Sequence, residues 1–305
     1  MFYNTLKIFI RLALNIFCKK IRVNNRHLLN TKGPLLLTVN HPNGLLDAII
    51  IGALFKQPVH YLTRGDVFNT HWKRKMMGKL NMIPIYRLSE GSENLHLNQF
   101  AFDRSKEVLK KNGIVLIFIE GFCKHTHTLQ PLKKGAARIA YNCWKEKIPL
   151  QILPITIRYN SLYKFGKNIL VQLVPPFTKQ EIMQQEDDAK NYLSFNKMVN
   201  HQLLQHLREP ISTQTPSNFL MFLPAMLGII IHASLYYPIK SFVEKKTNGN
   251  QFYDSVLFGL LLFLYPIFLL LFSIIIYLFT KNILVGIGAM VLFPITAWCA
   301  VRYKN

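Results

Sequence analysis

The alternation of apolar and mixed stretches in the first two thirds of the chain predicts strands separated by helices. Six short apolar runs have the length and composition of buried strands, at residues 35–39, 58–64, 82–87, 114–119, 149–159 and 168–174. Four other stretches have helical character, at residues 48–54, 92–112, 133–140 and 179–209. This alternation indicates an α/β domain with a mixed, mostly parallel sheet flanked by helices. We place the domain at residues 21–210.

The first 20 residues follow a different pattern. Asn4, Lys7, Arg11 and Asn15 recur at spacings of three and four among apolar neighbours. This spacing predicts an amphipathic helix over residues 1–20 with a narrow basic face. Such a helix can lie in the membrane interface, and packing onto the folded domain is the alternative. A signal peptide is disfavoured because the two cations interrupt its apolar region and no small-residue cleavage site follows.

The last third of the chain is apolar and predicts a membrane region at residues 219–305. A linker rich in Ser, Thr, Gln and Pro precedes it at residues 211–218. Residues 256–279 are long enough to cross the ~30 Å hydrocarbon core, and residues 283–301 are barely long enough. The short turn between them predicts a transmembrane helical hairpin. Residues 219–239 contain two prolines, a glycine and a histidine, so we expect this stretch to be interfacial or re-entrant.

Loop charges orient the predicted hairpin. If only the last two segments span, the lysines between residues 240 and 246 lie on the same side as Arg302 and Lys304, and Lys281 alone lies on the other side. If all three segments spanned, those lysines would lie outside together with Arg302 and Lys304, against the positive-inside rule. We therefore expect an integral membrane protein whose globular domain is on the cytoplasmic face.

Charge and cysteine usage narrow the class of protein. The chain has 305 residues and a formal net charge of +22, and 31 of its 37 lysines and arginines precede Pro210. A basic domain tethered to apolar segments suits a bilayer with anionic headgroups. Nucleic acid is disfavoured because no recognised binding motif accompanies the charge. The four cysteines and the pair His125 and His127 lack partners at metal-ligand spacing, so we expect free thiols and no bound metal.

A histidine and an aspartate stand where the first predicted strand gives way to a helix. His41 follows residues 35–39, and Asp47 lies six residues later. On a continuous helix the two side chains would point in different directions. The turn at residues 42–44, Pro-Asn-Gly, breaks the helix and lets them meet. General-base catalysis needs a histidine oriented in this way, although a buried histidine capped by an aspartate would have the same pattern.

Two further polar residues follow predicted strands. Arg87 comes at the end of residues 82–87, and Glu120 comes directly after residues 114–119. In sheets of this type the carboxyl ends of the strands carry the functional site. We therefore expect His41, Arg87 and Glu120 to lie at one edge of the sheet.

Several segments together resemble the glycerolipid acyltransferase family, whose members acylate glycerol 3-phosphate or lysophosphatidate. The segments that match in order and spacing are residues 40–47, 83–87, 118–121, 129–140 and 153–155. We match His41 and Asp47 to the His-x4-Asp motif of that family. The resemblance covers residues from about 30 to 210. Residues 252–259 also resemble the C-terminal membrane region of a glycerol-3-phosphate acyltransferase-like branch.

The resemblance implies a membrane-bound O-acyltransferase in phospholipid synthesis. His41 would remove the proton from an acceptor hydroxyl, and Asp47 would hold the imidazole and stabilise its cation. The oxygen would then attack an acyl thioester, either acyl-CoA or acyl carrier protein, which is a co-substrate. Neither a nucleophilic side chain nor a cofactor is expected. Backbone amides near the start of the Asp47 helix would stabilise the oxyanion.

The resemblance also implies that Arg87, Glu120 and Gly121 bind the glycerol-phosphate acceptor. An arginine suits phosphate because it can donate two parallel hydrogen bonds. Glu120 is an anion, so it would accept a hydrogen bond from a glycerol hydroxyl or position a cation. Around this pair the chain departs from the family, which usually has Pro, Thr and Arg where this chain has Ile119, Phe122 and Cys123.

The missing arginine leaves the phosphate contacts open, and other cations are candidates for them: Arg64, Lys133 and Lys134. Two alternative functions stay open as well. One is a catalytically inactive, membrane-anchored lipid-binding protein, which the intact His41 and Asp47 disfavour. The other is an acyltransferase for another lysolipid. The sequence leaves the acceptor open among glycerol 3-phosphate, dihydroxyacetone phosphate, lysophosphatidate and other lysolipids.

Overall fold

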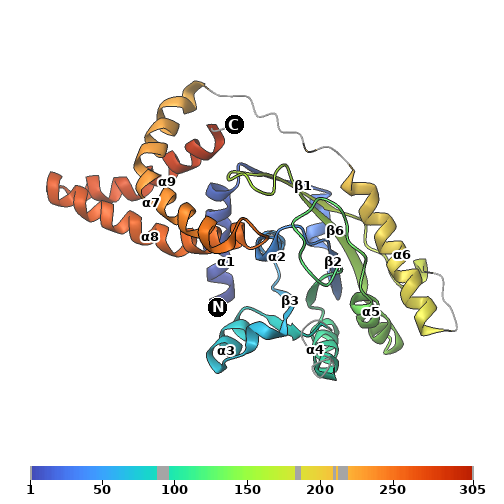
Figure 1. Ribbon diagram of the computed structural model, residues 1–305. Helices are drawn as coiled ribbons and strands as arrows, with labels where there is room; N and C mark the ends of the chain where they lie inside the picture. The colour runs from blue at the N-terminus through green and yellow to red at the C-terminus, as the bar shows by residue number, and fades with distance from the viewer. Residues whose placement is uncertain (1, 88–95, 183–186, 209–210, 212–218, 304–305) are drawn as a thin grey trace.

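The computed structural model describes residues 2–87, 96–182, 187–208, 211 and 219–303. These residues form a seven-stranded sheet with helices on both faces, and the C-terminal helices extend to one side (Figure 1). The strands are β1 (Lys20–Asn24), β2 (Leu35–Val39), β3 (Val59–Arg64), β4 (Met82–Ile85), β5 (Ile114–Phe118), β6 (Gln151–Tyr159) and β7 (Asn168–Leu173). The helices are α1 (Phe2–Phe17), α2 (Gly44–Leu54), α3 (His71–Lys79), α4 (Asn98–Lys110), α5 (Gly135–Lys145), α6 (Asp188–Leu207), α7 (Phe222–Thr247), α8 (Tyr253–Thr280) and α9 (Ile283–Tyr303).

The sheet is mixed and mostly parallel, which confirms the predicted fold class. Its strand order is β1-β7-β6-β2-β5-β3-β4. β6 and β7 are antiparallel, and the other neighbouring pairs in the described residues are parallel. The central strand β2 is buried along its whole length, as expected for a strand covered on both faces. The carboxyl ends of β2 to β6 therefore lie at one edge.

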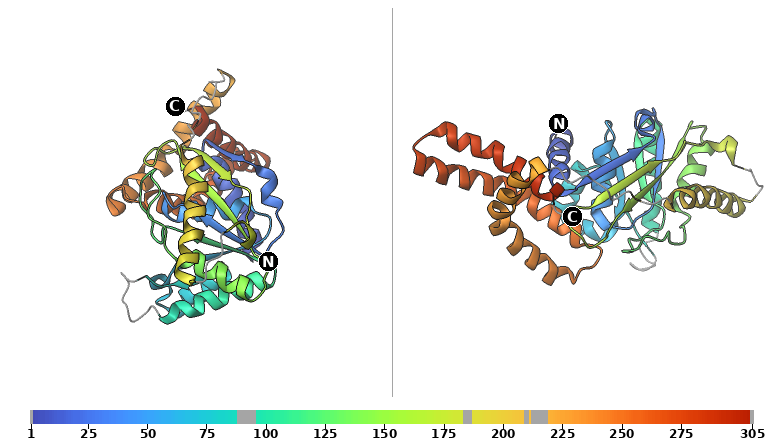
Figure 2. Two further views of the ribbon diagram at one scale, coloured as in Figure 1. Left: turned by 90° about the vertical axis from the view of Figure 1, so that its right-hand side faces the viewer. Right: turned by 90° about the horizontal axis from the view of Figure 1, so that it is seen from above.

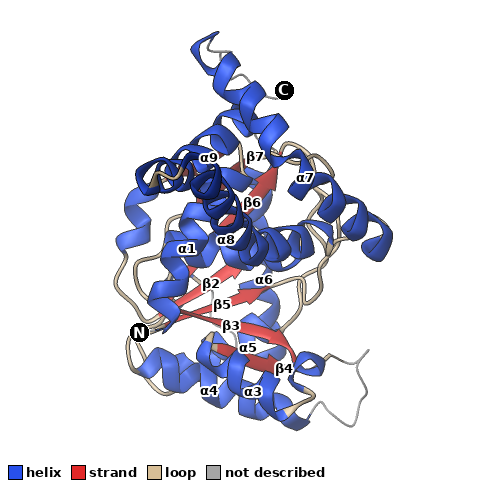
Figure 3. Cartoon of the chain, turned by 90° about the vertical axis from the view of Figure 1, so that its left-hand side faces the viewer, coloured by secondary structure: helices blue, strands red, loops and turns tan. Residues whose placement is uncertain are grey.

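Helices cover the two faces of the sheet and build two cores. Side chains of β2 alternate between them, with Leu35 and Leu37 in one core and Leu36 in the other, because successive side chains of a strand point to opposite faces. The first core contains residues of α1, α2 and the start of α8, and the second contains residues of α4, α5 and α6. In Figure 3, α1 and α8 lie in front of the strands.

The edge strand β1 was not predicted from the sequence. It pairs in parallel with β7, and Ile21 and Val23 pack against the first core. Only these two apolar residues alternate with Lys20 and Arg22, so the strand contains no apolar run. Its pairing with β7 is the tertiary contact that makes it a strand.

Several predicted boundaries shift, and two of the shifts lie on either side of Arg87. The strand predicted to reach Arg87 ends at Ile85. Asn98 of α4 binds both backbone groups of Tyr86, because its Oδ1 accepts from Tyr86 N at 2.7 Å and its Nδ2 donates to Tyr86 O at 2.8 Å. The helix predicted at residues 92–112 is observed as α4 from Asn98 to Lys110, and residues 92–95 lie outside the described residues.

The cations of α1 point toward the folded domain. Lys7 is 6% exposed and donates to Lys56 O and Gln57 O at 3.2 and 3.3 Å. Arg11 donates to Ala53 O at 2.6 Å and to a second carbonyl. These carbonyls belong to the end of α2 and the loop after it, where helix carbonyls lack partners and cations are favoured. The helix thus packs onto the domain, and its exposed side is the apolar one, with Ile8, Phe9 and Leu12 each more than half exposed.

Three C-terminal segments within the described residues are long and apolar enough to cross a membrane, which indicates membrane association. They are Phe219–Thr247, which includes α7, and the helices α8 and α9. α7 is one continuous helix across Pro238. α8 and α9 form a hairpin that projects from the domain (Figure 2). Which of the three segments span, and which is interfacial, stays a prediction.

The helices α7 and α9 touch through backbone atoms. A Cβ added at Gly228 of α7 would lie 2.1 Å from the carbonyl oxygen of Thr296 in α9. Small residues allow such close approach between membrane helices. A Cβ added at Gly288, in contrast, would have no atom within 4 Å.

We expect Gly228→Ala to destabilise the helix packing by about 1–3 kcal/mol, because a backbone oxygen cannot move aside as a flexible side chain can. The measurement is the thermal unfolding midpoint of the purified protein in detergent. Gly288→Ala is the control, and its midpoint should stay the same or rise slightly because alanine favours helix. Equal midpoints for the two variants would contradict the close contact.

Candidate active site

The candidate site forms where β2 ends and α2 begins. Asn40 closes the strand, because its side chain exchanges hydrogen bonds with the backbone N–H and carbonyl of Ile157 in β6 at 2.8 and 3.0 Å. The chain then turns through residues 41–43 into α2. Gly44 starts the helix with a φ of +56°, a conformation that glycine adopts without steric cost. An added Cβ there would also lie 2.6 Å from Gln251 O.

His41 and Asp47 meet as expected from the turn. His41 Nδ1 lies 2.9 Å from Asp47 Oδ2, and Asp47 is fully buried while the His41 side chain is 16% exposed. A carboxylate only accepts, so Nδ1 carries the proton and Nε2 is the acceptor. The imidazole also stacks on Phe118, with ring centroids 3.7 Å apart and planes 8° apart. The ring is therefore held by one hydrogen bond and one stacking contact.

The assignment to a His-x4-Asp motif was wrong in its spacing. Five residues separate His41 from Asp47, one more than that motif has. The extra residue is accommodated before the helix, because Asn43 has non-helical dihedral angles and Gly44 is left-handed. The two side chains still meet because the helical part between them is only one turn.

Asp47 has two further donors. Its Oδ2 accepts from Asn43 N at 2.8 Å, and its Oδ1 accepts from Tyr159 Oη at 2.5 Å. Burial raises the pKa of Tyr159, and the neighbouring Asp47 raises it further, so the hydroxyl keeps its proton and donates. Tyr159 is the last residue of β6. Tyr159 was not predicted from the sequence, although a hydroxyl at the carboxyl end of a predicted strand was an available signal.

Glu120 holds the backbone of His41. It lies two residues beyond β5 and is 3% exposed. Its Oε1 accepts from His41 N at 2.7 Å, and its Oε2 accepts from Gln130 N at 3.0 Å. Burial raises the pKa of Glu120, and these two hydrogen bonds act in the opposite direction. Both carboxylate oxygens of Glu120 thus accept from backbone amides. The expected contact of this carboxylate with a glycerol hydroxyl of the acceptor or with a cation stays a prediction.

The other predicted binding residues surround this edge of the sheet. Gly121 has a φ of +73°, and an added Cβ would lie 2.8 Å from Lys133 Cγ. Lys133 and Lys134 are exposed at the start of α5. Arg87 follows β4, and its charge acts on the Cys123 thiol. The guanidinium of Arg64, the last residue of β3, is paired with Asp66.

Cys123 stands where the glycerolipid acyltransferase family, which the sequence resembles, usually has an arginine. Its Sγ accepts the backbone N–H of Gly44 at 2.9 Å. Burial raises the pKa of Cys123 to about 12, and Asp47 nearby adds to the effect, so the group is a neutral thiol at physiological pH and a poor nucleophile. Two more amides at the start of α2 have acceptors, since Asn43 N donates to Asp47 and Leu46 N donates to Ser255 Oγ. These two amides and that of Gly44 are therefore not the donors predicted to stabilise the oxyanion.

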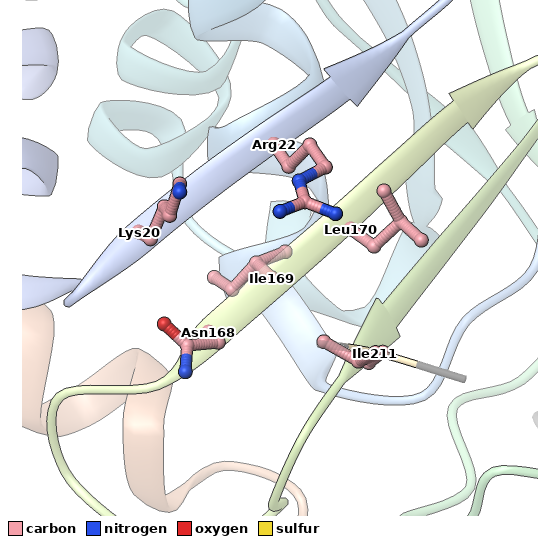
Figure 4. A pocket seen from close by; sticks show the side chains of 6 residues that line it. All are labelled: Lys20, Arg22, Asn168, Ile169, Leu170 and Ile211. Carbon is pink, nitrogen blue, oxygen red and sulfur yellow. The ribbon is translucent and has the colours of Figure 1, made fainter. Parts of the chain in front are cut away.

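A hollow of about 320 Å³ lies beside the end of β6 and is lined by His127, Arg158, Tyr159, Asn160, Leu207 and Ile211. Among the described residues, no group of three His, Cys, Asp or Glu side chains is arranged so that it could hold a metal ion, and the expectation of a site without metal or cofactor stays a prediction. A pocket of about 10 Å³ lies on β1 and β7 and is lined by Lys20, Arg22, Asn168, Ile169, Leu170 and Ile211 (Figure 4). It holds at most one water and contains none of the predicted site residues.

We expect Tyr159→Phe to lower the free energy of unfolding by about 1–3 kcal/mol, because Asp47 Oδ1 would lose its donor inside the protein. Thermal or denaturant unfolding in detergent measures the change. Tyr163→Phe is the matched control, since Tyr163 is 69% exposed and its ring contact with His125 is kept. If both variants unfold like the parent protein, the buried hydroxyl does not contribute as described.

Comparisons with known proteins find similar sequences of one enzyme class. Residues 20–158 match the family model described as Acyltransferase. A protein of Mycoplasma genitalium named "Probable 1-acyl-sn-glycerol-3-phosphate acyltransferase" is 23% identical over 210 residues, which cover 66% of this chain and 73% of the relative. A protein of the same name from Mycoplasma pneumoniae is 24% identical over 126 residues, which cover 40% of this chain and 45% of the relative.

Among solved structures, the 1-acyl-sn-glycerophosphate (LPA) acyltransferase of Thermotoga maritima matches with a TM-score of 0.47 and 13% identity, over 67% of this chain and 81% of that chain. The family model extends from β1 to all but the last residue of β6, and so includes α2 and the turn that carries His41 and Asp47. The family model and the named relatives support the glycerolipid acyltransferase family for residues 20–158 of this chain.

Proposed function

We propose that the protein transfers a fatty acyl group from an acyl thioester to a hydroxyl of a glycerol-phosphate acceptor, at the cytoplasmic face of a membrane. The observation that carries the proposal is the buried Asp47 carboxylate holding Nδ1 of His41 at 2.9 Å, in a chain whose residues 20–158 match the Acyltransferase family model. Both curated relatives are named for 1-acyl-sn-glycerol 3-phosphate, and we infer that this lysophosphatidate is the first acceptor to test.

The reaction follows from the state of His41. Nε2 accepts the proton of the acceptor hydroxyl, and the oxygen attacks the thioester carbonyl to give a tetrahedral oxyanion. The carbon–sulfur bond then breaks, and the leaving thiolate of coenzyme A or acyl carrier protein takes the proton back from the imidazolium. Asp47 stabilises the imidazolium while it exists. The products are an ester and a free thiol, and His41 returns to its starting state.

Cations around the site support an anionic acceptor. Lys133 and Lys134 are exposed beside the Glu120-Gly121 turn, and the charge of Arg87 acts to lower the pKa of the Cys123 thiol. Positive charge at one edge raises the local concentration of an anionic lipid, and an arginine can bind phosphate through two donors. We assign Arg87 the first phosphate contact and the two lysines a supporting one, with Arg64 as a weaker candidate because Asp66 already pairs with it.

The membrane helices support a lipid product. α8 leaves the domain at Tyr253, and α9 returns to it, since Arg302 near its end donates to Asn15 O of α1 at 3.0 Å. The apolar residues Ile8 and Phe9 of α1 are exposed on the domain. A hairpin that leaves and returns on the side of the domain agrees with two spans and a cytoplasmic catalytic domain.

We expect His41→Ala to lower turnover by roughly 10²- to 10⁴-fold, which is the usual contribution of a general base. The assay uses purified full-length protein with labelled acyl-CoA or acyl carrier protein and a panel of glycerol 3-phosphate, dihydroxyacetone phosphate, lysophosphatidate and other lysolipids. His201→Ala, at an exposed histidine of α6, is the control and should keep parental turnover. Turnover that survives His41→Ala would refute the mechanism, and an inactive parent with every acceptor would favour the lipid-binding alternative.

We expect a cysteine introduced at Lys281 to be labelled from outside intact cells by an impermeant maleimide, and one at Asn248 to be protected. Lys281 is at the tip of the hairpin, and Asn248 lies in the loop before α8. The unmodified protein, with its four native cysteines, measures the background. Labelling at Asn248 would mean that the loop is outside and that the proposed orientation is wrong.

A further inference from the structure

A buried carboxylate from the C-terminal membrane region reaches the active-site turn. Asp254 lies in the first turn of α8 and is 1% exposed. Its Oδ2 accepts a hydrogen bond from Asn43 Nδ2 at 2.6 Å. The backbone N–H of Asn43 in turn donates to Asp47 Oδ2 at 2.8 Å. One residue therefore connects the carboxylate of the membrane region to the carboxylate that holds His41.

Lys167 neutralises Asp254 inside the protein. Its Nζ pairs with Asp254 Oδ2 and also donates to Leu162 O at 2.7 Å, and both charged side chains are almost fully buried. Burial lowers the pKa of Lys167, and the Asp254 carboxylate acts in the opposite direction. A well-packed apolar pair often stabilises a fold as well as a buried ion pair does. Stability alone is therefore a poor account of this pair, whereas an oriented Asn43 needs an acceptor at a fixed position.

A second set of contacts joins the same two helix starts. Ser255 Oγ accepts the backbone N–H of Leu46 at 3.2 Å. At Gly44 an added Cβ would lie 2.6 Å from Gln251 O and 3.1 Å from Ser255 Oγ, so the two backbones are in direct contact. Leu257 of α8 is completely buried in the core that α2 also shares. The start of α8 is therefore packed into the catalytic domain.

We propose that Asp254 is a positioning residue for the His41–Asp47 pair and acts through Asn43, so that the start of the membrane region completes the active site. Asp254 fixes the Asn43 side chain, which keeps the Asn43 N–H aimed at Asp47 Oδ2. Asp254 touches neither the reacting atoms nor a predicted acceptor contact. Its loss should lower kcat and leave KM for donor and acceptor unchanged. The kinetic part of this inference rests on the proposed acyl transfer.

The test must separate the hydrogen bond from the ion pair, because removing Asp254 alone leaves the Lys167 charge buried without its partner. Two double variants of the full-length protein do this. Both D254N/K167M and D254L/K167M remove the ion pair. Only the first keeps a side-chain oxygen that can accept from Asn43 Nδ2.

We expect D254N/K167M to keep kcat within about threefold of the parent and D254L/K167M to lose about 10- to 100-fold, as small displacements of catalytic groups do. KM should stay within about twofold for both. K240M/E244Q removes an exposed ion pair of α7 and is the control with parental kinetics. In an Asn43→Ala background, D254L/K167M should cause no further loss, because both changes break the same connection.

Equal kcat for D254N/K167M and D254L/K167M would overturn the proposal, as would a loss confined to KM or losses that multiply with Asn43→Ala. If D254L/K167M lacks a parental unfolding midpoint, Asn43→Ala alone is the test: a kcat loss with constant KM supports the proposal, and parental kcat refutes it.

Amide hydrogen exchange of residues 40–47, measured by mass spectrometry, provides a readout without substrate. Exchange should be faster in D254L/K167M than in D254N/K167M, and equal rates would refute the positioning role. If exchange is faster in D254L/K167M but the parent protein transfers no acyl group, the positioning role stands and only the proposed function is refuted.

Discussion

The structure of the turn between β2 and α2 depends on one buried carboxylate, that of Asp47. Asp47 has no exposed surface, and an ionised carboxylate without partners is very costly in such a place. Its two oxygens are satisfied by His41, by the backbone of Asn43 and by the hydroxyl of Tyr159. These donors come from the turn after β2 and from the end of β6. Parallel pairing of β2 with β6, in which Val39 faces Ile155, brings the two segments to the same edge.

Glu120 makes the complementary connection to β5. It binds the backbone N–H of His41, while Asp47 binds the ring. Phe118, from the end of the same strand, stacks on the imidazole. The histidine is thus fixed at its backbone, its Nδ1 and its ring face, and Nε2 is left to accept a proton. Such fixation lowers the reorganisation that a reaction would require.

The helix that carries Asp47 is held at both ends by segments outside the α/β domain. At its start, Asp254 and Ser255 of α8 bind Asn43 and Leu46. At its other end, Lys7 and Arg11 of α1 donate to the carbonyls of residues 53–57. The same segments present apolar surface, which the bilayer can cover. In the proposed function, the same elements would attach the protein to the membrane and support the site.

The sequence alone determined the features that repeat locally. Apolar runs located six of the seven strands, the long apolar stretches located the C-terminal helices, and the Pro-Asn-Gly turn brought His41 and Asp47 together. These signals are readable because periodicity and turn chemistry act over a few neighbouring residues. The sequence also marked Lys7 and Arg11 as one face of a helix, but it could not say what that face would contact.

Only the tertiary structure decided the partners. Tyr159 lies 112 residues from Asp47 and Asp254 lies 211 residues from Asn43, and neither pairing leaves a local pattern. The strand β1 exists through its pairing with β7, and Glu120 became a backbone acceptor because the end of β5 lies beside the turn after β2. The sequence shows which polar residues will need a hydrogen-bond partner if they are buried. Strand order and register decide which group becomes that partner.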